Sequence, residues 1–231
     1  MKVFAISDLH LSINCPKPMD IFGGAWENYV EQIEQNWRQT VGADDLVLIA
    51  GDISWAMSLE GAKPDLDYIG SLPGKKVLLR GNHDYWWKSI SAVRAALSGQ
   101  TYAVQNDALR FNDVIVAGSR GWTTPERGNS SPDDKKIYDR ELIRMELSLT
   151  AMQKLRGPLD KTAVMIHYPP FDSSLSPSPF TDLFTRFNVD AVIYGHLHGK
   201  DCRAALTSNL NGVSYYLTSC DQLKNTLVRI F

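Results

Sequence analysis

The chain has 231 residues, of which 44% are hydrophobic, and a formal net charge of −2 at pH 7. This length and apolar content suit one large core, and no linker rich in Pro, Gly or Ser divides the chain, so we expect a single domain over residues 1–231. The near-neutral charge argues against a protein built to bind nucleic acid or an anionic membrane, although it does not exclude a local basic patch.

The cysteines exclude a disulfide framework. There are three, at Cys15, Cys202 and Cys220, and they have neither an even number nor the spacing of a metal finger. The chain enters an apolar run directly after Met1, without the pattern of a signal peptide, and no run approaches the ~20 apolar residues of a membrane span. We therefore expect a cytoplasmic protein, and the sequence leaves its oligomeric state open.

The first half alternates short apolar runs with striped segments. Strands are predicted over 2–7, 46–50 and 76–79. Helices are predicted over 26–37, 64–72 and 86–97, the second opening with Pro64. The apolar stripe Trp26, Val30, Ile33 and Trp37 is typical of core packing. This alternation predicts a parallel sheet with helical crossovers.

The second half continues the pattern. Further strands are predicted over 101–105, 113–118, 162–166, 190–194, 213–219 and 226–231, with helices over 138–152 and 180–187. We expect the last two strands to form an antiparallel pair across the polar segment 220–225. The polar stretch 119–136 is too long for an ordinary connection and predicts a functional flap or a mobile loop.

All five histidines lie at the ends of predicted strands. They are His10, His83, His167, His196 and His198. Oxygen ligands stand at the same kind of position in Asp8, Asp52 and Asn82. Ligands of open α/β sheets bind outside the carboxyl ends of the strands, so these side chains are expected to converge on one site.

The mixture of imidazole, carboxylate and amide oxygen suits Mn, Fe or Zn better than Ca or a thiolate-seeking metal. The candidate ligands are Asp8, His10, Asp52, Asn82, His167, His196 and His198. Seven ligands are too many for one ion and fit two ions that share a carboxylate. Asp52, a lone acid at its strand end, is the natural bridge. In an extended strand, Asp8 and His10 would face the same side, as would His196 and His198.

Each residue also has an ordinary interpretation. Aspartates such as Asp8 and Asp52 are common in turns at strand ends, and a single histidine such as His167 is commonly a satisfied core or surface residue. Without a metal site, these ordinary interpretations would have to apply at every one of the strand ends at once. The joint pattern therefore favours a metal site.

Five motifs in order carry a family resemblance. They are Asp8-Leu9-His10, Gly51-Asp52, Gly81-Asn82-His83-Asp84, the lone His167, and Gly195-His196-Leu197-His198. This set resembles the calcineurin-like metallophosphoesterase superfamily. The resemblance implies an α/β (α+β) fold, a four-layer αββα sandwich of two packed mixed β-sheets flanked by helices.

The resemblance also implies roles for the motif residues. One ion would be held by Asp8, His10, Asp52 and His198, and a second by Asp52, Asn82, His167 and His196. A hydroxide between the two ions would attack the phosphorus atom. His83 would contact the phosphate or act as general acid to the leaving group. Asp84 would either orient His83 or cap the next helix.

The sequence argues against some classes of phosphoester substrate and leaves others open. The residues after Asp52 lack the Asp-Arg-Gly of protein serine/threonine phosphatases, and the large basic surfaces of repair nucleases are missing. We expect a hydrolase of a small-molecule or nucleotide phosphoester, monoester or diester, with a non-catalytic scaffold or a nuclease as alternatives. Loops 11–25, 119–136 and 168–180 are expected to set specificity.

Several nearby residues have two interpretations each. Arg80 could bind phosphate or pair with an acid, and Tyr85, Trp86 and Trp87 could stack on a ring or pack in the core. The weaker candidates for a substrate wall are Trp122, Tyr168 and Phe171.

Overall fold

Two mixed sheets form the centre of the molecule. The computed structural model describes residues 1–125, 131–172 and 174–231. The first sheet has the order β11-β1-β2-β3-β4. Its strands are β1 (Val3–Ile6), β2 (Leu46–Ile49), β3 (Lys75–Leu78), β4 (Thr101–Ala103) and β11 (Val228–Arg229). β1 to β4 are parallel, and β11 runs antiparallel to β1.

The second sheet has the order β5-β6-β7-β8-β10-β9. Its strands are β5 (Asp107–Phe111), β6 (Val114–Gly118), β7 (Lys161–Met165), β8 (Ala191–Tyr194), β9 (Thr207–Leu210) and β10 (Val213–Leu217). β6, β7, β8 and β10 are parallel, and antiparallel hairpin partners close both edges.

The helices are α1 (Tyr29–Thr40), α2 (Leu59–Ser71), α3 (Ile90–Ala96), α4 (Pro132–Leu155) and α5 (Pro179–Arg186), with short 3₁₀ turns at Asp20–Phe22 and Gly24–Trp26. Four of these helices begin after a serine that caps them. A serine side chain accepts a backbone N–H at the start of α2, α3, α4 and α5. These serines satisfy donors that a helix leaves unpaired in its first turn.

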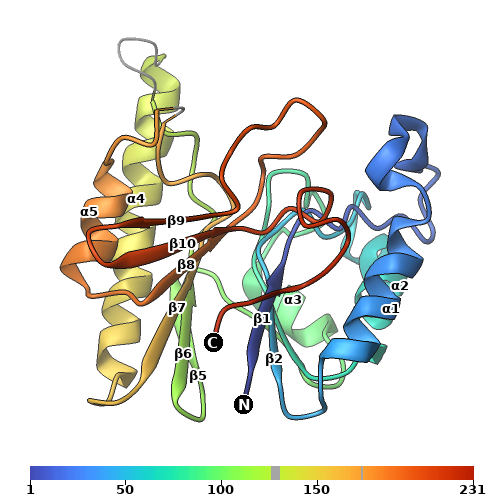
Figure 1. Cartoon of the computed structure of the whole chain (residues 1–231), viewed down its shortest axis with the longest axis horizontal. Helices are drawn as coiled ribbons and strands as arrows, with labels where there is room; N and C mark the ends of the chain where they lie inside the picture. Colours follow the sequence, from blue (N-terminus) through green and yellow to red (C-terminus); the bar gives the residue numbers. More distant parts are fainter. Residues whose placement is uncertain (126–130, 173) are drawn as a thin grey trace.

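The layers follow the order helix, sheet, sheet, helix (Figure 1). α1, α2 and α3 cover the outer face of the first sheet, and α4 and α5 cover the outer face of the second. A third core lies between the sheets and joins strand residues of both. Because the central strands are buried on both faces, they read as continuous apolar runs rather than alternating ones. The predicted four-layer sandwich is confirmed.

The predicted pairing of the last two strands is wrong. β10 lies in the second sheet between β8 and β9, whereas β11 pairs with β1 in the first sheet. The segment between them crosses from one sheet to the other, because the open edge of β1 offers hydrogen bonds. The two ends of the chain meet there, with the Val3 N–H donating to the Phe231 carbonyl at 3.1 Å (Figure 1).

Two hairpin strands were not predicted. β9 turns into β10 through Asn211-Gly212, and β5 turns into β6 through Asn112-Asp113. Asn112, Asn211 and Gly212 have positive φ, as short hairpin turns demand. The Asn-Gly signal was available in the sequence, but the strand before it is polar.

Several predicted boundaries also shift. Pro64 lies inside α2, which begins at Leu59 after the Ser58 cap. Trp26 and Trp86 precede their helices rather than opening them. The polar stretch 119–136 ends early, because Ser131 caps α4 and Pro132 begins it. Residues 126–130 and 173, parts of two predicted loops, lie outside the described residues.

Among the helices of the described residues, none combines the length and apolarity needed to cross a membrane.

Candidate metal centre

Strand ends from both sheets meet at one edge of the sandwich. β1, β2 and β3 deliver the first three motifs, and β7 and β8 deliver the last two. Each of the five histidines follows the carboxyl end of a strand, as predicted. The site therefore lies across the seam between the sheets rather than on a single one.

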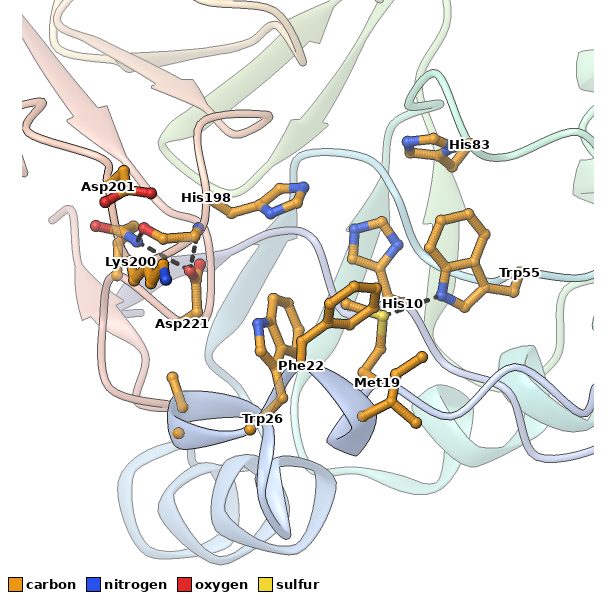
Figure 2. Close-up of a pocket in the computed structure, with 16 residues that line it drawn as sticks. His10, Met19, Phe22, Trp26, Trp55, His83, His198, Lys200, Asp201 and Asp221 are labelled. Carbon is orange, nitrogen blue, oxygen red and sulfur yellow. Dashed lines mark hydrogen bonds between the residues drawn. The ribbon is translucent and has the colours of Figure 1, made fainter.

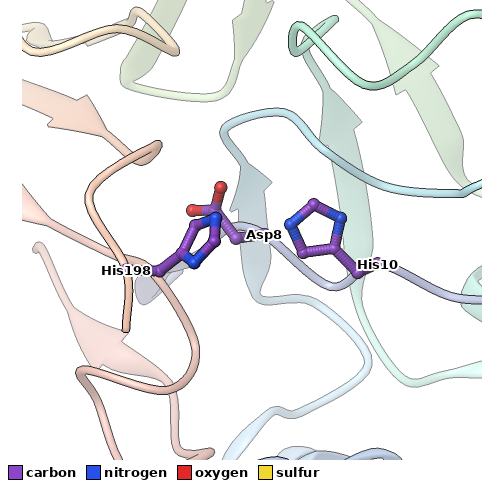
Figure 3. Close-up of side chains that lie close together, drawn as sticks. All are labelled: Asp8, His10 and His198. Carbon is purple, nitrogen blue, oxygen red and sulfur yellow. The ribbon is translucent and has the colours of Figure 1, made fainter. Parts of the chain in front are cut away.

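Asp8, His10 and His198 form one cluster (Figure 3). Each offers a ligand atom within 4.8 Å of the others. Asp8 and His10 are buried, whereas His198 is exposed. The cluster joins the end of β1 to the end of β8, two segments from opposite ends of the chain.

A second cluster contains Asp8, Asp52 and His167, again with ligand atoms within 4.8 Å of one another. The Oδ1 atom of Asn82 lies 2.7 Å from His167 Nε2 and 2.9 Å from His196 Nδ1. Asp52 Oδ2 lies 3.5 Å from His167 Nε2 and 3.8 Å from His10 Nε2. The carboxylate of Asp52 therefore stands between the two halves of the site. The structure brings all seven candidate ligands together.

The backbone at these residues is not extended. Asp8, His10, Asp52 and His196 have positive φ, between 44° and 70°. A positive φ is uncommon in residues other than glycine and clusters at functional sites. Asp8 and His10 do lie close together, but not because they belong to an extended strand as predicted. Both residues follow the end of β1, and their left-handed backbone brings them together.

Glycines in the motifs allow the ligand loops to touch. A Cβ on Gly81 would lie 2.1 Å from Asp52 Oδ1 and 2.2 Å from the Asp52 backbone nitrogen. A Cβ on Gly195 would lie 2.5 Å from Asp8 Oδ2. Both distances are far inside van der Waals contact, so a side chain at either position would push one predicted ligand away from another.

Buried polar atoms at the centre lack partners. Both ring nitrogens of His10 and Asp52 Oδ2 make no hydrogen bond within the part of the chain that the structure describes. Such groups are costly to bury unless something binds them. His167 Nδ1 donates to the Ala50 carbonyl at 2.9 Å, which turns Nε2 toward two oxygens. A positive charge, either a ring proton or a cation, is needed at that position. The residues present fit bound divalent metal ions.

The protonation states of His10 and His196 fit a metal site, whereas His167 would have to exchange a ring proton for the ion. Burial lowers the pKa of His10 to about 3 and that of His196 to about 4, so both are neutral and able to bind metal at pH 7. Burial also acts to lower the pKa of His167, but the Asp52 carboxylate outweighs it and raises the value to about 9. Burial acts to raise the pKa of Asp52, yet His167 and His10 bring it below its usual range.

His83 and Asp84 face different surroundings. The His83 ring lies 4.7 Å from the Trp55 ring and 5.7 Å from the His10 ring, centre to centre, and its backbone N–H donates to Asp52 Oδ1 at 2.8 Å. Its Nδ1 has no hydrogen-bond partner among the described residues. The ring also lines the cavity beside the two clusters, where a bound ligand would meet it.

Asp84 does neither of the things predicted for it. Its buried carboxylate accepts the N–H of Gly81 at 2.7 Å and of Ile53 at 2.8 Å, and the indole N–H of Trp86 at 3.0 Å. Within the described chain it makes no hydrogen bond to the His83 ring, and Ser89 caps the next helix. Asp84 instead fastens the loop after β3 to the loop after β2, and so positions Asn82 against Asp52.

A cavity of about 1010 Å³ opens beside the centre (Figure 2). His10, His83 and His198 line one side of it, with Phe22 and Trp26 opposite. Loop 11–25 supplies much of this wall. Phe22 is 68% exposed, so part of the wall is an apolar surface open to solvent.

Sequence reasoning missed two aromatic residues of this wall. Trp55 stacks on His10, with ring centres 4.6 Å apart and planes inclined by 18°. Trp26 packs in the core as predicted, against Tyr29, and its ring also lies 6.0 Å from the rings of His10 and His198. Position gave a usable signal for Trp55, which follows closely after the Gly51-Asp52 motif. Trp86 and Trp87 are fully buried core residues.

The remaining candidates lie on the other side of the centre. The Tyr168 ring lies 4.4 Å from the His196 ring and 5.3 Å from the Trp122 ring. Phe171 packs on Tyr194 and Tyr215 in the second core. Phe171 also lines a cavity with His196 and His198. Tyr168 and Trp122 lie beside His196 but are not among the residues that line this cavity.

Known proteins resemble this chain along most of its length. A family model for calcineurin-like phosphoesterases matches residues 1–200. The Gene 66 protein of Mycobacterium phage D29 is 24% identical over 213 residues, which cover 89% of this chain and 83% of that protein. The Gene 66 protein of Mycobacterium phage L5 is 36% identical over 78 residues, 34% of this chain and 37% of that protein.

Two solved structures share the fold. The protein TT1561 of Thermus thermophilus aligns with a TM-score of 0.63 and 12% identity, covering 99% of this chain and 97% of that one. A protein of unknown function from Aquifex aeolicus, AQ665, aligns with a TM-score of 0.52 and 14% identity, covering 99% and 95%. At these identities the likeness shows the fold alone.

Proposed function

This chain belongs to the calcineurin-like phosphoesterase family, and we propose that it hydrolyses a phosphomonoester or phosphodiester of a small molecule or nucleotide, using two metal ions such as Mn, Fe or Zn. The family supports metal-dependent hydrolysis of phosphoesters. The observation that carries the proposal is the pair of clusters that share the buried Asp8, together with the unpartnered atoms of His10 and Asp52 that face them.

In this proposal the ligands divide into two sets. One set is Asp8, His10, Asp52 and His198, and the other is Asp52, Asn82, His167 and His196. Divalent ions bound there would polarise the phosphoryl oxygens and lower the pKa of a bound water molecule. Asp84 and the close approach of Gly81 to Asp52 keep the two sets in register.

His83 is the residue that we assign to the leaving group. It borders the cavity beside His10, and its ring nitrogen Nδ1 is unpartnered in the described part of the chain. Burial lowers the pKa of His83. A phosphate dianion beside the ring would raise that pKa again, because an opposite charge favours the protonated form. Substrate binding would thus prepare His83 to donate a proton to the departing oxygen.

The organic part of the substrate would lie in the cavity. Trp55 and Phe22 offer flat apolar surfaces, and Lys200 and Asp221 close the far end (Figure 2). These surfaces would exclude water from the reacting bond and favour an ester of a ring or another apolar alcohol. We propose that residues 1–231 form one domain, which the packing of Val3 and Ile230 into the core between the sheets supports.

The test compares hydrolysis of para-nitrophenyl phosphate and bis-para-nitrophenyl phosphate. Protein stripped of metal would be reconstituted separately with Mn²⁺, Fe²⁺ and Zn²⁺. Turnover that appears only with metal supports the proposal, and the faster substrate distinguishes monoester from diester. If neither ester is cleaved with any of the three ions, the proposed hydrolase activity is contradicted.

A further inference from the structure

A second, smaller cavity lies at the same edge of the sandwich and is lined by arginines. Its volume is about 300 Å³. Arg80 follows β3, Arg120 follows β6, and Arg140 and Arg144 come from α4. Glu141 is the only acidic residue among those that line it. Four guanidinium groups therefore gather around one carboxylate.

The single carboxylate cannot satisfy the cluster. Arg144 pairs with Glu141 at 2.6 Å, while Arg120 reaches the same carboxylate only at 4.0 Å and also lies over the Trp122 ring. Within the described ranges of the chain, Arg80 and Arg140 donate no side-chain hydrogen bond to protein, and Arg80 Nε is buried without a partner. Like charges that line one small cavity repel, and a buried guanidinium N–H needs an acceptor.

The cluster borders the metal centre. Arg80 lies two residues before Asn82, and the Arg120 carbonyl accepts the His167 N–H at 3.0 Å. The arginines thus adjoin the half of the centre that contains Asn82 and His167. They lie away from the aromatic cavity, which contains neither Arg80 nor Arg120.

We propose that Arg80, Arg120, Arg140 and Arg144 form a binding site for a phosphate-type dianion, distinct from the phosphate that is cleaved. The planar fork of guanidinium matches the oxygens of a phosphate, and four arginines against one carboxylate suit a dianion better than a second single charge. A volume of about 300 Å³ holds a phosphate or pyrophosphate group but not a nucleic-acid strand. The dianion is either a second phosphate of the substrate or free phosphate.

Isothermal titration with inorganic phosphate and pyrophosphate tests the site directly. The titration uses metal-stripped Asp52→Asn protein, so the metal centre cannot bind the anion. We expect saturable binding that weakens at least ~10-fold in Arg140→Gln, since Arg140 is exposed and a lost charge-assisted contact costs that much. Lys154→Gln removes the same charge from the same helix outside the cavity and should bind like the parent. Equal binding by both variants, or no saturable binding by the parent, would overturn the proposal.

Enzyme kinetics then distinguish whether the dianion is a second phosphate of the substrate or free phosphate. This experiment rests on the proposed phosphoesterase activity. If the substrate supplies the dianion, Arg140→Gln raises KM several-fold for butanediol bisphosphate and leaves KM unchanged for para-nitrophenyl phosphate. If free phosphate is the ligand, the two KM values respond alike. Absence of any turnover would count against the proposed function alone, because the titration does not require activity.

Discussion

His83 sits at the contact between the two ligand clusters and the aromatic cavity. Its backbone and its side chain do different things: the N–H fixes Asp52 Oδ1, and the ring faces the cavity. Substitution of the side chain therefore separates catalysis from ligand positioning.

We predict that His83→Ala lowers kcat by about 10²-fold to 10⁴-fold, the usual contribution of a well-placed acid. Metal content and thermal stability should stay close to those of the wild-type protein, because the N–H to Asp52 is kept. Steady-state kinetics with metal analysis check this. Tyr85→Phe, which alters an exposed neighbour of the His83 ring, is the control. An unchanged kcat would remove His83 from the reaction.

For Asp84 we expect the opposite result, an effect on stability and metal affinity, because its carboxylate holds the loops and does not contact the substrate. Asp84→Asn keeps the size of the side chain but replaces one carboxylate oxygen with an NH₂ group, which then faces either the Gly81 N–H or the N–H groups of Ile53 and Ser54. We expect a loss of about 1–3 kcal/mol in the free energy of unfolding, the cost of unsatisfied buried donors. Metal affinity should fall as well, since Asn82 and Asp52 lose their mutual alignment. Urea denaturation and Mn²⁺ titration measure both effects, and normal stability with normal affinity would contradict the assignment.

The residues that converge at the site could be predicted from the sequence, whereas the geometry that brings them together could not. The aspartates, histidines and asparagine that follow the strand ends can be identified directly in the sequence. The left-handed backbone at Asp8, His10, Asp52 and His196 depends on how the loops from the two sheets meet. The positioning role of Asp84 depends on the same contact, so it too needed the structure.

At the scale of elements, Lys76 joins a strand to the end of a helix. Lys76 belongs to β3, and its side chain is buried. Its ammonium group donates to the carbonyls of Gly70, Leu72 and Gly74, at 3.2, 2.7 and 2.9 Å. These carbonyls lie at and just beyond the C-terminus of α2, where a helix leaves acceptors unpaired and favours a positive charge. Burial lowers the Lys76 pKa, which is the cost of this arrangement.

We predict that Lys76→Met destabilises the protein by about 1–3 kcal/mol, because the apolar side chain fills the space but leaves three buried carbonyls unpaired. Lys75→Met, its neighbour in the same strand, should change stability by less than about 0.5 kcal/mol. Urea denaturation of both variants makes the comparison. Equal effects would show that the interaction with the end of α2 contributes nothing.

Elements were predictable where the apolar pattern was strong. The buried runs of β1, β2, β7 and β8 and the stripe of α4 read clearly in the sequence. β9 did not, because its residues alternate between exposed and half-buried and carry polar side chains. The weak hydrophobic signal hid a strand that its Asn211-Gly212 turn would have revealed.

At the scale of the molecule, the chain closes on itself. β11 returns to β1 after the chain has completed the second sheet, and Ile230 enters the core between the sheets. Pairing between the two ends of a chain leaves no local signal in sequence, so the sequence suggested a local hairpin instead. Long-range pairing of this kind is decided by which strand edge is left open.

We predict that Ile230→Ala destabilises the fold by about 2–4 kcal/mol, the usual cost of a cavity in a core, while metal binding remains. Leu206→Ala, which shortens a 44% exposed side chain, is the matched control and should have little effect. Chemical denaturation with metal titration tests both. A loss of stability as small as that of the control would mean that the ends of the chain do not contribute to the core.

The measurement that tests the metal-dependent hydrolase most directly is the turnover of para-nitrophenyl phosphate by metal-stripped protein as Mn²⁺ is added back. Wild-type protein should regain activity as two ions bind. Asp52→Asn, which lacks the carboxylate between the clusters, should bind fewer ions and lose nearly all turnover. Full activity in the stripped protein, or equal activity in Asp52→Asn, would contradict the account.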